Sequence, residues 1–186
     1  TDIEQPEWGG WGGRRERLFP GRNFFVDGRD KHPSSNDPQR EKQWSLGRWA
    51  QAISNDFAAR LDWQVKPPSE TNPPPVARVN NDATIRVLRK TVSPGETVKL
   101  DATGSSDPDG NKLSYKWWQY DEPGTLGEHI RLVGADDIRA TFIAPQVSEP
   151  RTLHVILEVT DDGIPQLTGY RRVVFTIAPS QSRSAK

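Results

Sequence analysis

The spacing of apolar residues changes near residue 75, and this change divides the chain into two parts. In the first part, apolar residues recur at steps of three and four, which predicts an amphipathic helix over residues 46–62. The apolar stripe of this helix consists of Leu46, Trp49, Ala50, Ile53, Phe57 and Leu61. Ser45 is a candidate N-cap, and Pro67-Pro68 follows as a stop signal. Such a stripe needs a partner surface, which the rest of the chain need not supply in full.

In the second part, apolar and polar residues alternate, as they do in strands with one buried face. Strands are expected at 76–80 with 84–88, and then at 96–102, 112–120, 129–133, 140–143, 152–160 and 170–177. Turn clusters separate them, among them Ser93-Pro94-Gly95 and Asp161-Asp162-Gly163. About seven short strands with this spacing predict a mainly β fold, an immunoglobulin-like sandwich over residues 76–178.

Alternation also assigns the faces of three strands that adjoin in one sheet of such a fold. Leu153, Val155, Leu157 and Val159 share the core face, and Trp117 is expected to be the buried tryptophan typical of the third strand. The opposite, outer face of the sheet would then gather Trp118, Tyr120, His154, Ile156, Glu158, Tyr170 and Arg172.

Composition narrows the possible functions. Hydrophobic residues make up 33% of the 186, and Gly and Pro number 15 and 16, so loops take a large share. Seven Trp and six Phe nevertheless argue against wholesale disorder. The 25 basic and 25 acidic residues balance, which gives no reason to expect nucleic acid, and no apolar run is long enough to span a membrane. Cysteine is absent, which removes disulfides, thiolate nucleophiles and Cys-based zinc sites.

The organisation expected from these patterns has four parts. Residues 1–65 form an irregular segment, rich in Trp and Gly, that ends in the helix, and residues 66–75 form a semi-rigid proline-rich linker. The sandwich follows at 76–178, and a disordered tail at 179–186. Thr1 opens no signal-peptide pattern and the chain has no Met, so an exported protein or a fragment is expected.

Two stretches resemble a known family. The segment from Val98 to Trp117, with its Asp-Ala-Thr-Gly-Ser-Ser-Asp-Pro-Asp-Gly run, resembles the PKD and cadherin-like modules of bacterial extracellular proteins. PKD modules continue Trp-Asp-Phe-Gly-Asp-Gly, whereas this chain has Trp118-Gln-Tyr-Asp. The Trp-Trp-Gln-Tyr sequence at this point and the segment from His154 to Arg172 instead resemble the C-terminal domain of bacterial proteins called cellulose-binding.

This resemblance implies a domain order. In that family a nucleoside-hydrolase-like domain precedes the Ig-like one, and the Trp-Gly-Gly-Trp-Gly-Gly-Arg stretch from Trp8 looks like its end. The expected partners are therefore a polysaccharide and an upstream domain of the same parent protein, and the expected location is extracellular or periplasmic. Nucleoside hydrolases hold calcium with an Asp-x-Asp-x-x-x-Asp-Asp motif, and nothing in this sequence matches it.

Exposed aromatic rings are the main candidates for a carbohydrate site, because the C–H face of a sugar stacks on Trp and Tyr. The candidate residues are Trp118, Tyr120, His154, Glu158 and Arg172 on the outer face, with Trp8 and Trp11 near the N-terminus. In the alternative, another domain or residues 1–63 cover the outer face, and the outward Ile156 favours this interpretation. Trp8 and Trp11 would likewise fit into the core of an absent domain.

Asp107, Asp109 and Asn111 offer oxygen ligands at alternate positions, as calcium loops do. The same sequence is an ordinary turn, since Pro presets φ and Gly accepts positive φ. The turn interpretation is favoured, so no cofactor is expected and calcium stays the alternative.

No residue pattern predicts catalysis by this chain. The adjacent carboxylates Asp136-Asp137 and Asp161-Asp162 fit solvated turns, and the three His residues show no metal-binding spacing. The expected function is non-catalytic binding of cellulose or a related polysaccharide. The alternative is a structural accessory domain that completes a nucleoside-hydrolase-like glycosidase.

Overall fold

The chain forms two compact units, residues 1–72 and 73–186, in a computed structural model that describes residues 5–82 and 84–179. The division between the units lies inside the stretch 66–75 that the sequence marks as a linker. The predicted disordered tail, 179–186, lies outside the described residues except for its first residue. Each unit is described by itself below.

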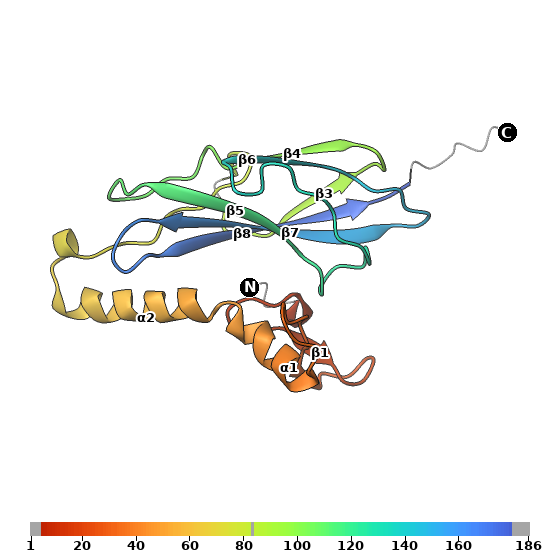
Figure 1. Ribbon diagram of the computed structural model, residues 1–186, viewed down its shortest axis with the longest axis horizontal. Helices are drawn as coiled ribbons and strands as arrows, with labels where there is room; N and C mark the ends of the chain where they lie inside the picture. Colours follow the sequence, from red (N-terminus) through yellow and green to blue (C-terminus); the bar gives the residue numbers. More distant parts are fainter. Residues whose placement is uncertain (1–4, 83, 180–186) are drawn as a thin grey trace. The chain divides into compact units, whose positions relative to one another are not determined.

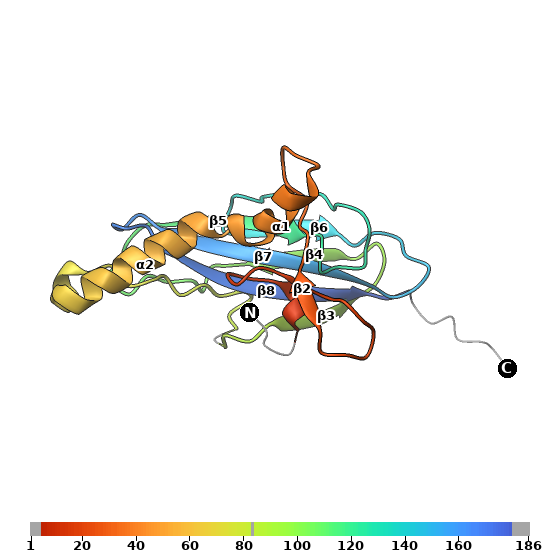
Figure 2. The same ribbon diagram turned by 90° about the horizontal axis from the view of Figure 1, so that it is seen from below.

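The second unit consists of two β-sheets (Figure 1). Its strands are β3 (Leu88–Val92), β4 (Thr97–Asp101), β5 (Leu113–Tyr120), β6 (Arg139–Ile143), β7 (Arg151–Asp161) and β8 (Thr168–Ile177). One sheet has the order β3-β8-β7-β5, which Figure 2 shows face on, and β4 pairs with β6 in the other. All pairs are antiparallel except β3 with β8. This arrangement confirms the predicted mainly β, Ig-like sandwich.

Side chains from both sheets form one core, as the alternation predicts. β7 contributes Leu153, Val155, Leu157 and Val159, all of them buried, and Phe142 of β6 meets Phe175 of β8 edge to face with 5.2 Å between the ring centres. Trp117 is buried in the same core, and its indole nitrogen donates to the carbonyl oxygen of Asp137 at 3.0 Å. The predicted buried tryptophan is therefore confirmed.

The predicted strand at 129–133 is wrong, because this segment forms only an isolated bridge between Val133 and Thr141. The Gln119 side chain satisfies its backbone instead. Its amide nitrogen donates to the carbonyl of Glu128 at 2.8 Å, and its oxygen accepts from the backbone N–H of Ile130 at 2.8 Å. A side chain thus replaces a strand partner, which alternation alone does not reveal.

The strand pair predicted at 76–80 and 84–88 is also wrong. Val76 makes an isolated bridge to Ser106, and β3 begins only at Leu88. Asn80 and Asn81 both adopt positive φ, which turns the chain out of an extended conformation. The buried guanidinium of Arg171 then binds the following loop through the carbonyl oxygens of Asp82, Thr84 and Arg86 and the Asp82 carboxylate.

The first unit is more regular than the sequence suggests. It contains η1 (Pro6–Trp8), the hairpin strands β1 (Arg15–Arg17) and β2 (Phe25–Asp27), α1 (Pro38–Gly47), α2 (Ala50–Val65) and η2 (Pro68–Glu70). The single predicted helix at 46–62 is thus corrected to two helices, with a break at Arg48 and Trp49.

The start of α1 explains why the helix prediction began too late. Asp37 is the N-cap, its carboxylate accepting from the backbone N–H of Gln39 at 2.7 Å, and Pro38 occupies the first helical position. Ser45 is not a cap but a buried residue inside α1, where its hydroxyl oxygen accepts from the backbone N–H of Arg14. The Asp-Pro pair was the helix-start signal in an otherwise polar stretch.

We expect Phe142→Ala to lower the free energy of unfolding of the sandwich by about 3–5 kcal/mol, since it removes a buried ring and leaves a cavity. The matched control is Ile143→Ala at the next position of β6, where the side chain is exposed and the cost should stay below about 1 kcal/mol. Urea unfolding followed by tryptophan fluorescence measures both. Equal losses at the two positions would contradict the assignment of the faces.

Candidate functional site

The outer face of the β5–β7–β8 sheet brings together the residues that the sequence assigns to it. Trp118 pairs with Ile156, and Ile156 with Arg172, so these three form one row across the sheet. Tyr120, His154 and Val174 form the next row, and Lys116, Glu158 and Tyr170 form a third. The predicted adjacency of these three strands is confirmed.

Specific contacts fix the aromatic rings in this face. The indole nitrogen of Trp118 donates to a carboxylate oxygen of Glu158 at 2.9 Å. The Trp118 and Tyr120 rings lie 5.3 Å apart at 45°, and the guanidinium of Arg172 lies 5.3 Å from the centre of the Tyr120 ring. The rings are therefore held in place before any ligand binds, although they are not parallel.

Burial separates the members of this face into two groups. Tyr120 and His154 are 0% and 1% exposed, and Ile156 is also buried. Trp118, Glu158 and Arg172 are half-buried. A ligand stacking on this face would therefore meet Trp118 and its two charged neighbours, because Tyr120 and His154 present no accessible surface.

His154 shows how strongly the face is shielded from water. Burial, together with the positive charges of Arg172 and Arg89, lowers the pKa of His154 to about 3. The imidazole is therefore neutral at physiological pH.

The N-terminal tryptophans lie apart from this sheet in the sequence, and both are half-buried in the first unit. Trp8 ends η1, and Trp11 lies in the turn that follows.

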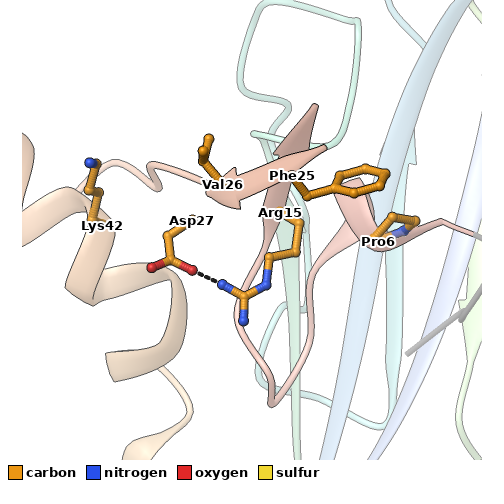
Figure 3. A pocket seen from close by; sticks show the side chains of 6 residues that line it. All are labelled: Pro6, Arg15, Phe25, Val26, Asp27 and Lys42. Carbon is orange, nitrogen blue, oxygen red and sulfur yellow. Dashed lines mark ion pairs between the residues drawn. The ribbon is translucent and has the colours of Figure 1, made fainter. Parts of the chain in front are cut away.

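The first unit also has a pocket that was not predicted from the sequence (Figure 3). Its volume is about 490 Å³, and it is lined by Pro6, Arg15, Phe25, Val26, Asp27 and Lys42. Arg15 and Asp27 form an ion pair across the hairpin. No residue of this pocket was a candidate, because the stretch from 15 to 42 carries no recognisable motif.

The Asp107 loop is a turn held by hydrogen bonds to one oxygen of the Asp107 carboxylate, while the other oxygen is buried without a hydrogen-bond partner among the described residues. The Asp107 carboxylate accepts from the backbone N–H groups of Asp109 and Asn111, and the Asn111 amide donates to Asp109 at 3.0 Å. The neighbouring Asp107 carboxyl raises the pKa of Asp109, with smaller contributions from burial and the charge of Asp161. Within residues 5–82 and 84–179, no group of three or more His, Asp or Glu side chains is placed to hold a metal ion.

The adjacent carboxylates at the end of β7 have separate structural roles. Asp161 is buried, and one of its oxygens accepts from the backbone N–H groups of Gly163 and Leu167. Asp162 accepts from the backbone N–H of Lys112 at 2.9 Å. The two carboxylates thus cap two different loops rather than face a common substrate.

The paired sheets, the buried Trp117 and the strand order place the second unit in the class of Ig-like, PKD-like β-sandwich domains. Residues 97–177 match the family described as "Cellulose-binding protein Sde0182, C-terminal domain". The resemblance stated from the sequence is therefore confirmed for this part of the chain.

Solved structures extend the comparison to the first unit. The chain is similar to a nucleoside hydrolase-related hypothetical protein from Saccharophagus degradans that is associated with carbohydrate metabolism, with 32% identity and a TM-score of 0.80. The match covers 95% of this chain but only 44% of that protein, so the chain spans less than half its length. The PKD domain of the KIAA 1837 protein is 25% identical, with a TM-score of 0.40 over 56% of this chain and 91% of its own.

No curated protein matches the chain. Among the residues that the structure describes, no helix has the length and apolar character needed to cross a bilayer.

We expect acidification to destabilise the protein through His154. Its folded-state pKa of about 3 lies below its usual value of about 6.5, so the unfolded state binds more protons between these two pH values. The free energy of unfolding should therefore fall as the pH drops below about 6.5, by at most about 1.4 kcal/mol per pH unit from this group.

The measurement is urea unfolding at several pH values from 7 to 4 for the wild type and His154→Gln. The slope should flatten in His154→Gln. An unchanged slope in His154→Gln would show that His154 titrates normally in the folded protein.

Proposed function

We propose that this chain is a non-catalytic binding domain for cellulose or a related polysaccharide. The observation that carries the proposal is the family match over residues 97–177, because that family is described as cellulose-binding. The S. degradans protein that matches both units is described as associated with carbohydrate metabolism, which supports the same class of ligand.

Trp118, on the outer face of the sheet, is the residue on which we propose that a sugar stacks. Trp118 is partly accessible, and its hydrogen bond to Glu158 fixes the orientation of the ring. A sugar that stacks its C–H face on the indole would have Glu158 and Arg172 nearby as acceptor and donors for its hydroxyl groups. Tyr120 and His154 would support this site from the adjacent row of the same face rather than contact the sugar.

The arrangement of acidic groups supports binding without catalysis. A glycosidase places two carboxyl groups about 5–10 Å apart across the scissile bond. At the end of β7, by contrast, Asp161 and Asp162 bind backbone N–H groups of separate loops. We also propose that binding needs no cofactor, since one oxygen of the Asp107 carboxylate already accepts from two backbone N–H groups of its own turn.

A second candidate function is a structural accessory domain of a longer, nucleoside-hydrolase-like protein. The burial of Tyr120, His154 and Ile156 favours it, because a face that binds a ligand needs side chains that the ligand can reach. The match to a nucleoside hydrolase-related protein favours it as well. Under either candidate, we propose that the protein acts outside the cytoplasm, where polysaccharides are encountered.

We expect the chain to bind one insoluble or soluble glycan among cellulose, xylan and agar-type polymers, and Trp118→Ala to weaken that binding roughly tenfold or more. Loss of one stacked aromatic ring is worth about 1.4 kcal/mol or more, which corresponds to this factor. Affinity electrophoresis and pull-down assays measure the binding, with thermal melts showing that each variant is folded.

Trp44→Ala is the matched control, because Trp44 lies in α1 of the first unit and packs against His32. It should bind as the wild type does. If the wild-type chain binds none of these glycans, the accessory-domain candidate takes precedence. If Trp44→Ala and Trp118→Ala lose binding equally, the site is not on the outer face of the sandwich.

A further inference from the structure

The two units differ in how many of their apolar side chains are buried. Among the described residues, the second unit buries twenty-two hydrophobic side chains, whereas the first unit buries two, Trp49 and Ala59. The first unit instead exposes eight large hydrophobic side chains: Leu18, Phe19, Phe24, Val26, Leu46, Phe57, Leu61 and Val65. A segment of this size with so small a core of its own does not provide the burial that stable folding requires.

The most continuous part of this exposed surface is one side of α2. Phe57, Leu61 and Val65 are 63%, 54% and 80% exposed, and they follow one another at intervals of four residues. Ile53 continues the row toward the start of the helix and is half-buried. Ile53, Phe57 and Leu61 belong to the apolar stripe that the sequence predicts, and Val65 extends the row to the end of α2. Of the other predicted members, Leu46 lies in α1 and Trp49 at the break between the helices.

The neighbouring row of α2 has small side chains. Ala50, Ser54 and Ala58 are exposed, and each lies three residues before a member of the apolar row. Helices pack closely when a ridge of large side chains on one helix fits into a groove between side chains on the other. On α2 a row of large side chains lies beside a row of small ones, which is the surface such packing requires. The exposed side of α2 therefore has the shape, as well as the apolar character, of a helix-packing surface.

The β1–β2 hairpin of the first unit also exposes apolar side chains. Phe19 and Phe24 flank its turn and meet edge to face at 6.4 Å, yet both are more than half exposed. Val26 of β2 is exposed and is one of the residues that line the pocket shown in Figure 3. Two separate elements of the first unit thus present apolar side chains with no core beneath them.

We propose that the exposed stripe of α2, formed by Ile53, Phe57, Leu61 and Val65, is the docking surface for the remaining part of a longer parent polypeptide. The first unit would then complete the core of that other domain, while the second unit folds around its own core. This assignment holds whether or not the sandwich binds carbohydrate.

The choice of this docking partner is supported by the similar protein from S. degradans. The match covers 95% of this chain, so it includes the first unit, but 56% of that protein lies outside the match. A partner in the same polypeptide is present at high effective concentration, so a stripe of four side chains is sufficient for docking. A second copy of this chain would have to bind through the same small area at ordinary protein concentration, which favours it less.

The test uses a single polypeptide, a chimera in which this chain replaces the matched part of the S. degradans protein. Hydrogen exchange with mass spectrometry compares residues 53–65 in the chimera and in this chain alone. We expect at least tenfold slower exchange of these amides in the chimera, because docking removes the helix from solvent. The double substitution Phe57→Ser with Leu61→Ser should abolish this difference.

The matched control is Ile85→Ser with Ile164→Ser, which replaces two side chains of the second unit that are 99% and 91% exposed. It should leave the protection of α2 unchanged. Equal exchange in the chimera and the isolated chain would overturn the proposal, as would a chimera that does not form a soluble, folded protein. Protection of α2 in the isolated chain that rises with concentration would overturn it in favour of self-association.

Discussion

The alternation of side chains along β7 determines most of what the second unit can do. β7 lies between β5 and β8 and pairs with both over most of its length. Its core-facing leucines and valines fix the register, because a slip of one residue would turn them all to the other face. The same register places Ile156 between Trp118 and Arg172, and His154 between Tyr120 and Val174. The outer face is therefore a direct consequence of how the core packs.

The sequence was sufficient to predict the parts that depend on local alternation. It predicted the fold class, the buried Trp117, the core face of β7 and the residues of the outer face. It did not predict that the Gln119 side chain would hydrogen-bond to the backbone of Glu128 and Ile130. Nor did it predict that Arg171 would bind Asp82, Thr84 and Arg86. Those contacts join residues that are 9 to 89 positions apart, so no local pattern reports them.

The sequence predicted which residues share the outer face, but not which of them are accessible to solvent. Alternation states which side of a sheet a residue lies on, yet it does not state whether that side meets water. Tyr120 and His154 lie on the predicted side and are buried, while Trp118 stays partly accessible. The opposite difference occurs on α2, where Phe57 and Leu61 lie on the predicted apolar stripe but are exposed. In both units, the missing information is what lies against the surface.

The most direct test of the proposed function is the indole N–H resonance of Trp118, one of seven such signals, in an isotope-labelled sample titrated with soluble cello-oligosaccharides or xylo-oligosaccharides. Stacking of a sugar on Trp118 would change the environment of this proton and of its hydrogen bond to Glu158. Polysaccharide binding at this face predicts a saturable shift of the Trp118 signal. Signals that stay unchanged, or shifts confined to the other tryptophans, would contradict it.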